Sequence, residues 1–105
     1  MTKCVLGVEN HKERFLTVIG NGCNSSTAII KTGWRKDRLV PVVAALLVTG
    51  EIFGVCYKTS TEHFVFFPNR TLAEEFLKTY RGKDAFLIDG RNCEDFLTIW
   101  KNNRN

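Results

Sequence analysis

A tryptophan among basic residues is the feature of this sequence best suited to binding another molecule. Residues 31–38 read Lys-Thr-Gly-Trp-Arg-Lys-Asp-Arg, and we expect them to form a loop. Arginine and lysine neutralise anionic groups, while an indole can fill a pocket on a partner protein or stack on a base. The alternatives are contact with nucleic acid and a solvated loop with the indole folded against the core edge. The predicted partner-binding residues are Lys31, Trp34, Arg35, Lys36 and Arg38.

Aromatic residues recur between positions 53 and 67, in two segments that we expect to pair as a hairpin. Successive strand residues point to opposite faces, so both faces of this hairpin carry apolar side chains. Both can belong to the core only if the sheet is covered on both sides, and otherwise some rings form an interface. The aromatic residues of the hairpin are Phe53, Tyr57, Phe64, Phe66 and Phe67, of which Tyr57, Phe64 and Phe66 are candidate partner-binding residues.

Histidine and cysteine could supply catalysis or metal binding, but they are scattered along the chain. His11 and His63 belong to no H-x-x-x-H motif, and the cysteines form no C-x-x-C pair. A nucleophile pair of His11 with Cys23, or of His63 with Cys56, would have to be assembled by the fold. We expect no catalytic residue, metal site or cofactor, and free thiols at Cys4, Cys23, Cys56 and Cys93.

Two acidic pairs and one glycine-rich stretch have simpler interpretations than acid–base catalysis or phosphate binding. Glu74-Glu75 and Glu94-Asp95 lie where helices are expected to start, and negative charge there is favoured by the helix dipole. Gly20-Asn21-Gly22 lacks the lysine and the helix of a phosphate-binding loop, so a turn is expected.

The first third of the chain is expected to form a three-stranded antiparallel meander. Residues 3–9 and 14–20 are rich in β-branched residues and flank a short polar stretch, as in a hairpin. Residues 21–26 favour a loop, and 27–32 then form the third strand.

The apolar run over residues 39–48 could be a buried strand or a buried helix. We favour a helix, with Asp37 as its cap, Pro41 in its first turn and Gly50 at its end.

Segments 51–58 and 63–67 predict a second hairpin. Thr71 and Glu74 form a capping-box pattern that predicts a helix with Gly82 at its end. Residues 84–89 predict a short strand, and Asn92 is expected to cap a last helix with Cys93, Phe96, Leu97 and Trp100 on its apolar side. A strand, helix, strand succession allows a parallel crossover, so the sheet is expected to be antiparallel or mixed.

Composition places the chain among ordinary globular proteins. It has 105 residues, of which 44% are hydrophobic and 25% charged, and its net charge is +4. The longest apolar run is shorter than the roughly 20 residues of a membrane span, and the start lacks the pattern of a secretory signal. We expect a single α+β domain over residues 1–105, with 101–105 frayed, and a cytoplasmic location.

The start of the chain also resembles proteasome-type N-terminal-nucleophile hydrolases, through Thr2, Gly7-Val8, residues 19–22 and Lys36. The resemblance covers about a third of the chain. It implies Thr2 as nucleophile and Lys36 as the family's lysine, but Asn21 stands where the family has an aspartate and Met1 precedes Thr2.

The expected function is that of a small non-enzymatic protein that binds another macromolecule, as an inhibitor or adaptor. Its size would suit a phage-type accessory protein. The expected partner is a protein, with nucleic acid as the alternative, a small hydrolase as a further one, and self-association also allowed.

Overall fold

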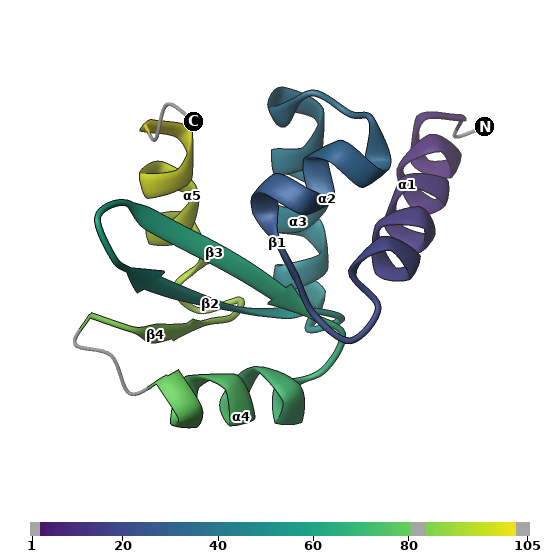
Figure 1. Cartoon of the computed structure of the whole chain (residues 1–105). Helices are drawn as coiled ribbons and strands as arrows, with labels where there is room; N and C mark the ends of the chain where they lie inside the picture. Colours follow the sequence, from purple (N-terminus) through teal and green to yellow (C-terminus); the bar gives the residue numbers. More distant parts are fainter. Residues whose placement is uncertain (1–2, 81–83, 103–105) are drawn as a thin grey trace.

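The computed structural model describes residues 3–80 and 84–102, and these form one compact α+β domain with five helices and four strands (Figure 1). The order of elements is α1 (Lys3–Ile19), β1 (Cys23–Asn24), α2 (Ser25–Thr32), α3 (Lys36–Thr49), β2 (Phe53–Lys58), β3 (Glu62–Phe67), α4 (Arg70–Tyr80), β4 (Phe86–Ile88) and α5 (Cys93–Asn102).

The four strands form one sheet in the order β1-β3-β2-β4. The hairpin of β2 and β3 is its centre, with six residue pairs from Phe53↔Phe67 to Lys58↔Glu62. All three pairings are antiparallel, so the mixed sheet allowed by the sequence is not formed. The chain returns from α4 to place β4 antiparallel to β2, which requires no parallel crossover.

Helices cover both faces of the sheet. Figure 1 shows α4 on one face and α1, α2, α3 and α5 on the other. Side chains alternate accordingly along β3, where Phe64 and Phe66 join the core beneath the four helices and Val65 and Phe67 join a smaller core with α4. The alternating aromatic pattern therefore reflects a sheet buried on both sides.

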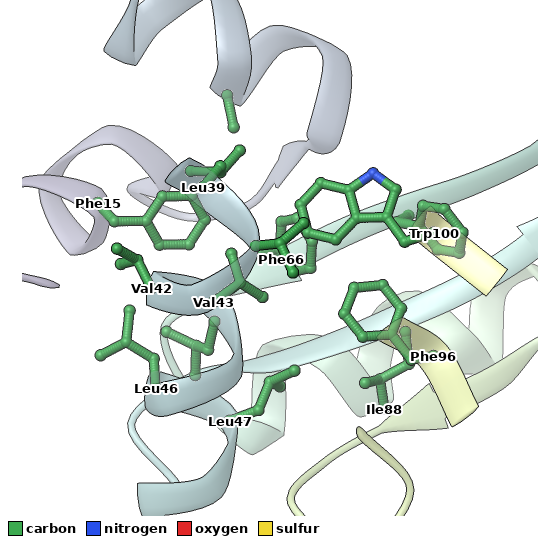
Figure 2. Packing of buried hydrophobic residues seen from close by; sticks show 14 of the residues in the cluster. Phe15, Leu39, Val42, Val43, Leu46, Leu47, Phe66, Ile88, Phe96 and Trp100 are labelled. Carbon is green, nitrogen blue, oxygen red and sulfur yellow. The ribbon is translucent and has the colours of Figure 1, made fainter. Parts of the chain in front are cut away.

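Helix α3 lies at the centre of the larger core. Leu39, Val43 and Leu46 are fully buried, and the helix packs between α1 and α5 (Figure 2). From the sheet, Phe66 contacts Trp100 of α5 with ring centroids 5.7 Å apart, and it contacts Phe15 of α1 at 5.8 Å. Six residues of the apolar run 39–48 are buried in this way, whereas Pro41 and Val48 are exposed. The structure confirms the helix predicted for this run.

The N-terminal meander predicted from the sequence is wrong, because residues 3–19 and 25–32 are helical. The polar stretch between the two predicted strands carries no glycine or proline, so the chain continues through it as one helix. Phe15 and Ile19 are buried and lie four residues apart, which places them on one helical face. Their burial outweighs the modest preference of β-branched residues for strands.

Helix α2 stands where the third strand was predicted, and a capping residue marks each of its ends. The side chain of Asn24 accepts a hydrogen bond from the backbone N–H of Thr27 at 2.8 Å, which caps the helix. Gly33 ends it in the left-handed conformation, with φ of 72°.

Helix α3 begins earlier than expected. Arg35 occupies its N-cap position without a side-chain cap, and Asp37 lies in the first turn instead of capping it. Pro41 consequently lies inside the helix, where it cannot donate a hydrogen bond to the turn before it. Gly50 ends the helix as predicted, with φ of 79°.

The cap of α4 is Asn69 and not Thr71. The helix begins at Arg70, and the Asn69 side chain accepts a hydrogen bond from the N–H of Leu72 at 3.0 Å. Glu74 does not complete a capping box, because its carboxylate pairs with Arg70 at 2.8 Å. The predicted stop at Gly82 lies outside the described residues.

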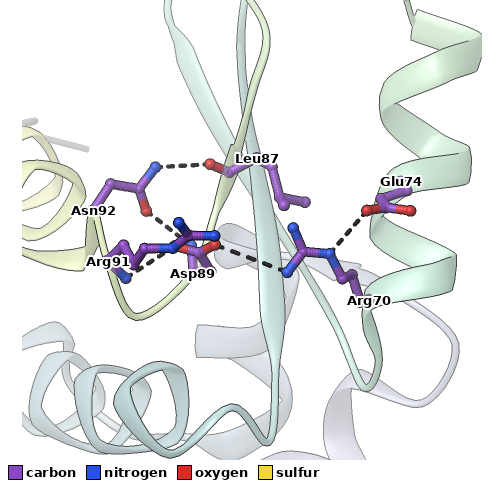
Figure 3. A network of polar contacts seen from close by, with 6 residues as sticks. All are labelled: Arg70, Glu74, Leu87, Asp89, Arg91 and Asn92. Carbon is purple, nitrogen blue, oxygen red and sulfur yellow. Dashed lines mark hydrogen bonds and ion pairs between the residues drawn. The ribbon is translucent and has the colours of Figure 1, made fainter.

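The last strand and helix follow the prediction, but Asn92 has a different role from the one expected. Its side-chain amide donates to the carbonyl of Leu87, and its oxygen accepts from the N–H of Asp89, both at 2.8 Å (Figure 3). The side chain therefore closes the turn between β4 and α5, while its backbone carbonyl accepts from Phe96 at the helix start. Lys101 and Asn102, expected in a frayed tail, belong to α5.

Gly22 joins α1 to the sheet at a point where no side chain fits. Its φ of 139° is a conformation that other residues rarely adopt. A Cβ atom there would lie 2.7 Å from the ring of Phe67, within the smaller core. The chain thus passes directly against the face of the sheet that α4 covers.

Replacing Asn69 tests the cap of α4. We expect Asn69→Ala to lower the free energy of unfolding by about 1 kcal/mol, because the Leu72 N–H loses its acceptor. Thr71→Ala is the matched control and should change stability by less than about 0.5 kcal/mol. Urea denaturation of both variants measures the difference. A larger loss for Thr71→Ala would contradict this cap.

Candidate functional site

The basic loop predicted from the sequence is mostly helical. Only residues 33–35 lie between helices, because Lys31 belongs to the last turn of α2 while Lys36 and Arg38 begin α3. We call Lys31, Trp34, Arg35, Lys36 and Arg38 the basic platform. Two helix ends hold it, so the backbone positions of its side chains are set by regular structure.

Trp34 is the fixed point of the basic platform. It is half-buried and packs against the larger core. The ring centroids of His11 and Trp34 lie 4.8 Å apart, and the guanidinium carbon of Arg14 lies 5.6 Å from the centroid of the Trp34 ring. Its backbone N–H donates to the hydroxyl of Thr32 at 3.1 Å. The side chain predicted to reach a partner is therefore largely occupied by contacts with α1.

Arg35 and Arg38 are the cations presented beside Trp34. The Arg35 side chain is 86% exposed, and its Nε lies 3.7 Å from the exposed carboxylate of Asp37. Arg38 is also exposed, with its guanidinium 3.2 Å from Nε2 of His11. An exposed ion pair of this length contributes little to stability, so Arg35 can exchange Asp37 for another anion at small cost. Both arginines line a hollow of about 460 Å³ together with Gly33, Trp34 and Asp37.

Lys36 points away from the other members of the platform. Its ammonium donates to the carbonyl of Trp100 at the end of α5 and lies 5.8 Å from the centre of that indole. Burial lowers the pKa of the Lys36 ammonium. Lys31 is exposed at the end of α2. The structure thus brings together Trp34, Arg35 and Arg38, and separates Lys36 from them.

The aromatic candidates divide between the core and the surface. Phe64 and Phe66 are 2% and 0% exposed, so neither presents its ring to a partner in this structure. Tyr57 is half-exposed on the α4 side of the sheet, where it stacks on His63 at 5.0 Å and contacts Tyr80 at 4.5 Å. Coverage of both sheet faces accounts for the buried pair.

Sequence reasoning missed a groove between α3 and α5. It has a volume of about 590 Å³ and a mostly apolar lining, with Val40, Pro41 and Ala44 from α3 and Leu97 from α5. Lys36 and Lys101 stand at its sides, with Asp37. The sequence feature that could have pointed to it is Pro41, which lies within the apolar run and is exposed in α3.

The two nucleophile pairs considered from the sequence are not supported by the described contacts. His63 hydrogen-bonds the hydroxyl of Thr59 at 2.9 Å and stacks on Tyr57, on the face of the sheet opposite Cys56. His11 contacts Trp34 and Arg38, while the Cys23 thiol donates to the carbonyl of Asn24 at 3.5 Å.

The described cysteines are buried free thiols, as predicted, at positions 23, 56 and 93. Burial raises the pKa of each of them, and raises that of Cys56 to about 11, with a smaller contribution from the charge of Glu62. A thiol with a raised pKa is a poor nucleophile near neutral pH, because little thiolate is present. The side chain of Cys4 lies outside the described part of the structure.

The remaining candidate groups have structural roles or fall outside the described residues. Glu94 and Asp95 lie in the first turn of α5, as predicted, whereas Glu74 and Glu75 lie beyond the first turn of α4. Residues 3–80 and 84–102 contain no cluster of three acidic, histidine or cysteine side chains that could hold a metal ion. Within the same residues, no helix has both the length and the apolar character needed to span a membrane. Thr2 of the hydrolase-like start is not among them.

Comparison with known proteins adds no assignment: no family model, curated protein or solved structure matches this chain.

Cys56 gives the protein a testable dependence on alkaline pH. Well below pH 9.0 the thiol is neutral in both the folded and the unfolded protein, so its contribution to stability is constant. Between pH 9.0 and about 11 the unfolded thiol ionises first, and stability falls by up to about 1.4 kcal/mol per pH unit. Urea denaturation from pH 8 to 11 measures this loss. Cys56→Ala should show a shallower decline, and equal slopes for the two proteins would contradict the raised pKa.

Proposed function

We propose that this domain is a small non-enzymatic protein that docks on another protein, as an inhibitor or adaptor. The observation that carries the proposal is the arrangement around Trp34. Two exposed arginines stand beside an indole that His11 and Arg14 hold in place. Binding to such a surface requires little ordering of side chains at the centre, which lowers the entropy cost of association.

An acidic protein surface is the partner that fits the basic platform. Arginine forms paired hydrogen bonds with carboxylates, and arginine and tryptophan are common among residues that dominate binding energy. The net charge of +4 would attract such a surface and speed the first encounter. The hollow beside Trp34 would receive one acidic side chain, which would take the place of the Asp37 carboxylate on Arg35 and also reach Arg38.

Nucleic acid is the weaker alternative because the Trp34 indole has little free surface for a base. A base stacks best on a free aromatic face, but Trp34 is half-buried and already contacts His11 and Arg14. The platform is also short, since Lys36 points towards Trp100 and Asp37 lies among the arginines. A small hydrolase gains no support from the described histidine and cysteine side chains.

A cytoplasmic location is part of the same proposal. The buried free thiols at Cys23, Cys56 and Cys93 suit a reducing compartment, where disulfides are rare. A role as a phage-type accessory protein is compatible with the size of the chain but has no further support.

Replacing Arg35 tests docking through the basic platform. The partner is first captured from native lysate on the immobilised domain and identified by mass spectrometry, and its affinity is then measured by surface plasmon resonance. We expect Arg35→Ala to weaken binding at least about fivefold, or about 1 kcal/mol, because an exposed arginine at an interface loses its carboxylate partner.

Lys78→Ala is the matched control, because it removes an exposed cation from α4, which lies on the other face of the sheet. It should leave the affinity within about twofold. Equal losses in the two variants would show a general charge effect and contradict docking at the platform. Capture of nucleic acid with a steep salt dependence would favour the alternative function.

A further inference from the structure

The groove between α3 and α5 follows two helices that lie antiparallel. The ammonium of Lys36, at the start of α3, binds the carbonyl of Trp100 near the end of α5. Gly90, in the turn before α5, packs against the carbonyl of Leu47 at the other end of α3. The groove has a volume of about 590 Å³, and its wall on α3, from Lys36 to Ala44, is about 12 Å long at the rise of a helix.

The outward side of α3 lacks the polar residues that a solvent-facing helix normally carries. Pro41 and Val48 are exposed, and Ala44 between them is half-buried. Their spacing of i, i+3 and i+7 places them on one helical face, and Val48 continues this apolar stripe beyond the groove. The side chain of Leu97 lies beside the stripe from α5. Two turns of apolar surface are thus left in water, which suits them to contact with another apolar surface.

Opposite charges stand at the two ends of this surface. Lys101 lines the groove at the end where α3 begins. Glu94 lies seven residues earlier on the same side of α5, about 10 Å away along the helix, with Leu97 between the two. Both side chains are exposed, and neither forms an ion pair with another side chain that the structure describes.

The other two charged residues of the lining already have partners. The Lys36 ammonium is bound to the carbonyl of Trp100, so its aliphatic chain is the part that serves as a wall. The Asp37 carboxylate lies 3.7 Å from Nε of Arg35 in the basic platform. Lys101 is therefore the lining charge that a partner can neutralise, and a carboxylate is its natural complement.

A third helix is the occupant that fits a groove between two helices. Side chains at i, i+3 or i+4 and i+7 of such a helix would interdigitate with those of α3 and α5. A helix also satisfies its own backbone hydrogen bonds, whereas an extended segment would find no strand edge in this groove to pair with.

We propose that the groove between α3 and α5 binds an amphipathic helix of a partner protein. The apolar side of that helix packs on the stripe of α3 and on Leu97, an acidic residue faces Lys101, and a basic residue two turns away faces Glu94. The proposal does not rest on docking at the basic platform, because the indole and the exposed arginines of the platform do not line this groove.

The test begins with a display library of amphipathic helical peptides, about four turns long, selected on the immobilised full-length domain. Selected sequences should share an apolar stripe with an acidic and a basic residue at its opposite ends. One selected peptide is then synthesised with a hydrocarbon staple on its polar side, and its affinity is measured by fluorescence polarisation. Nuclear magnetic resonance should place the largest amide shift changes of the domain at Val40, Ala44 and Leu97.

Reversal of one charge tests the contact at the end of the groove. We expect Lys101→Glu to weaken the peptide at least about threefold, because an attraction becomes a repulsion at an exposed site. Lysine in place of the acidic residue of the peptide should restore the affinity for this variant and weaken binding to the unmodified domain. This exchange measures the pair directly and does not depend on a change in stability.

A charge within the groove tests the apolar contact. Ala44→Glu should weaken the peptide more than about tenfold, because the peptide would have to desolvate a carboxylate. Ala45→Glu is the matched control: the residue is also half-buried in α3 but does not line the groove, so the affinity should stay within about twofold. Circular dichroism confirms that both variants are folded.

Arg35→Ala separates this proposal from the proposed function. It should leave the affinity for the peptide within about twofold, even where it weakens the partner of the basic platform. Loss of one binding activity without the other shows which of the two surfaces has failed.

Four results would overturn the proposal. These are the recovery of no helical peptide, equal affinities for the unmodified domain and Lys101→Glu, equal losses for Ala44→Glu and Ala45→Glu, and shift changes confined to the hollow beside Trp34. A dimer in sedimentation velocity that Ala44→Glu abolishes would assign the groove to a second copy of the chain instead.

Discussion

Burial of the β2–β3 hairpin on both faces is the constraint on which the rest of the fold depends. Its strands alternate apolar side chains towards each side, with Phe64 and Phe66 on one and Val65 and Phe67 on the other. Leaving either face in water would expose several large side chains, at roughly 25 cal/mol for each Å² of apolar surface. One helix, α4, suffices for the smaller core, whereas four helices enclose the larger one. The position of every helix follows from this division.

Sequence reasoning succeeded where local signals and burial agree. The β2–β3 hairpin, the helix ending at Gly50, the short strand around Leu87 and the last helix all have boundaries marked by turn residues or glycine. It failed over residues 3–32, where β-branched composition indicated strands. There the helices are stabilised by contacts with residues distant in the sequence, as in the packing of Phe15 on Phe66, and a local pattern does not contain such contacts. The cap of α4 was also placed two residues too late, because the side chain of Asn69, and not that of Thr71, accepts a hydrogen bond from the first turn.

At the candidate site, too, local sequence does not determine where the side chains point. The sequence places four basic residues near Trp34, but the direction of each side chain depends on tertiary contacts. Lys36 is one residue from Arg35, yet it turns to the carbonyl of Trp100, 64 positions away in the sequence. The fold therefore leaves Arg35 and Arg38 exposed, whereas it uses Lys36 to link α3 to α5. The groove between α3 and α5 likewise arises from how the two helices pack, which the sequence pattern does not contain.

Gly22 has a consequence for which substitutions the protein can accept. The residue lies in the turn between α1 and β1. The ring of Phe67 occupies the space that a methyl group on Gly22 would need, and this ring belongs to the smaller core beneath α4. A change at this position would therefore first disturb the smaller core beneath α4. Suppressors of such a change should arise at Phe67 or Phe76. A substitution in the turn that follows α1 is thus limited by the packing of the smaller core on the opposite side of the sheet.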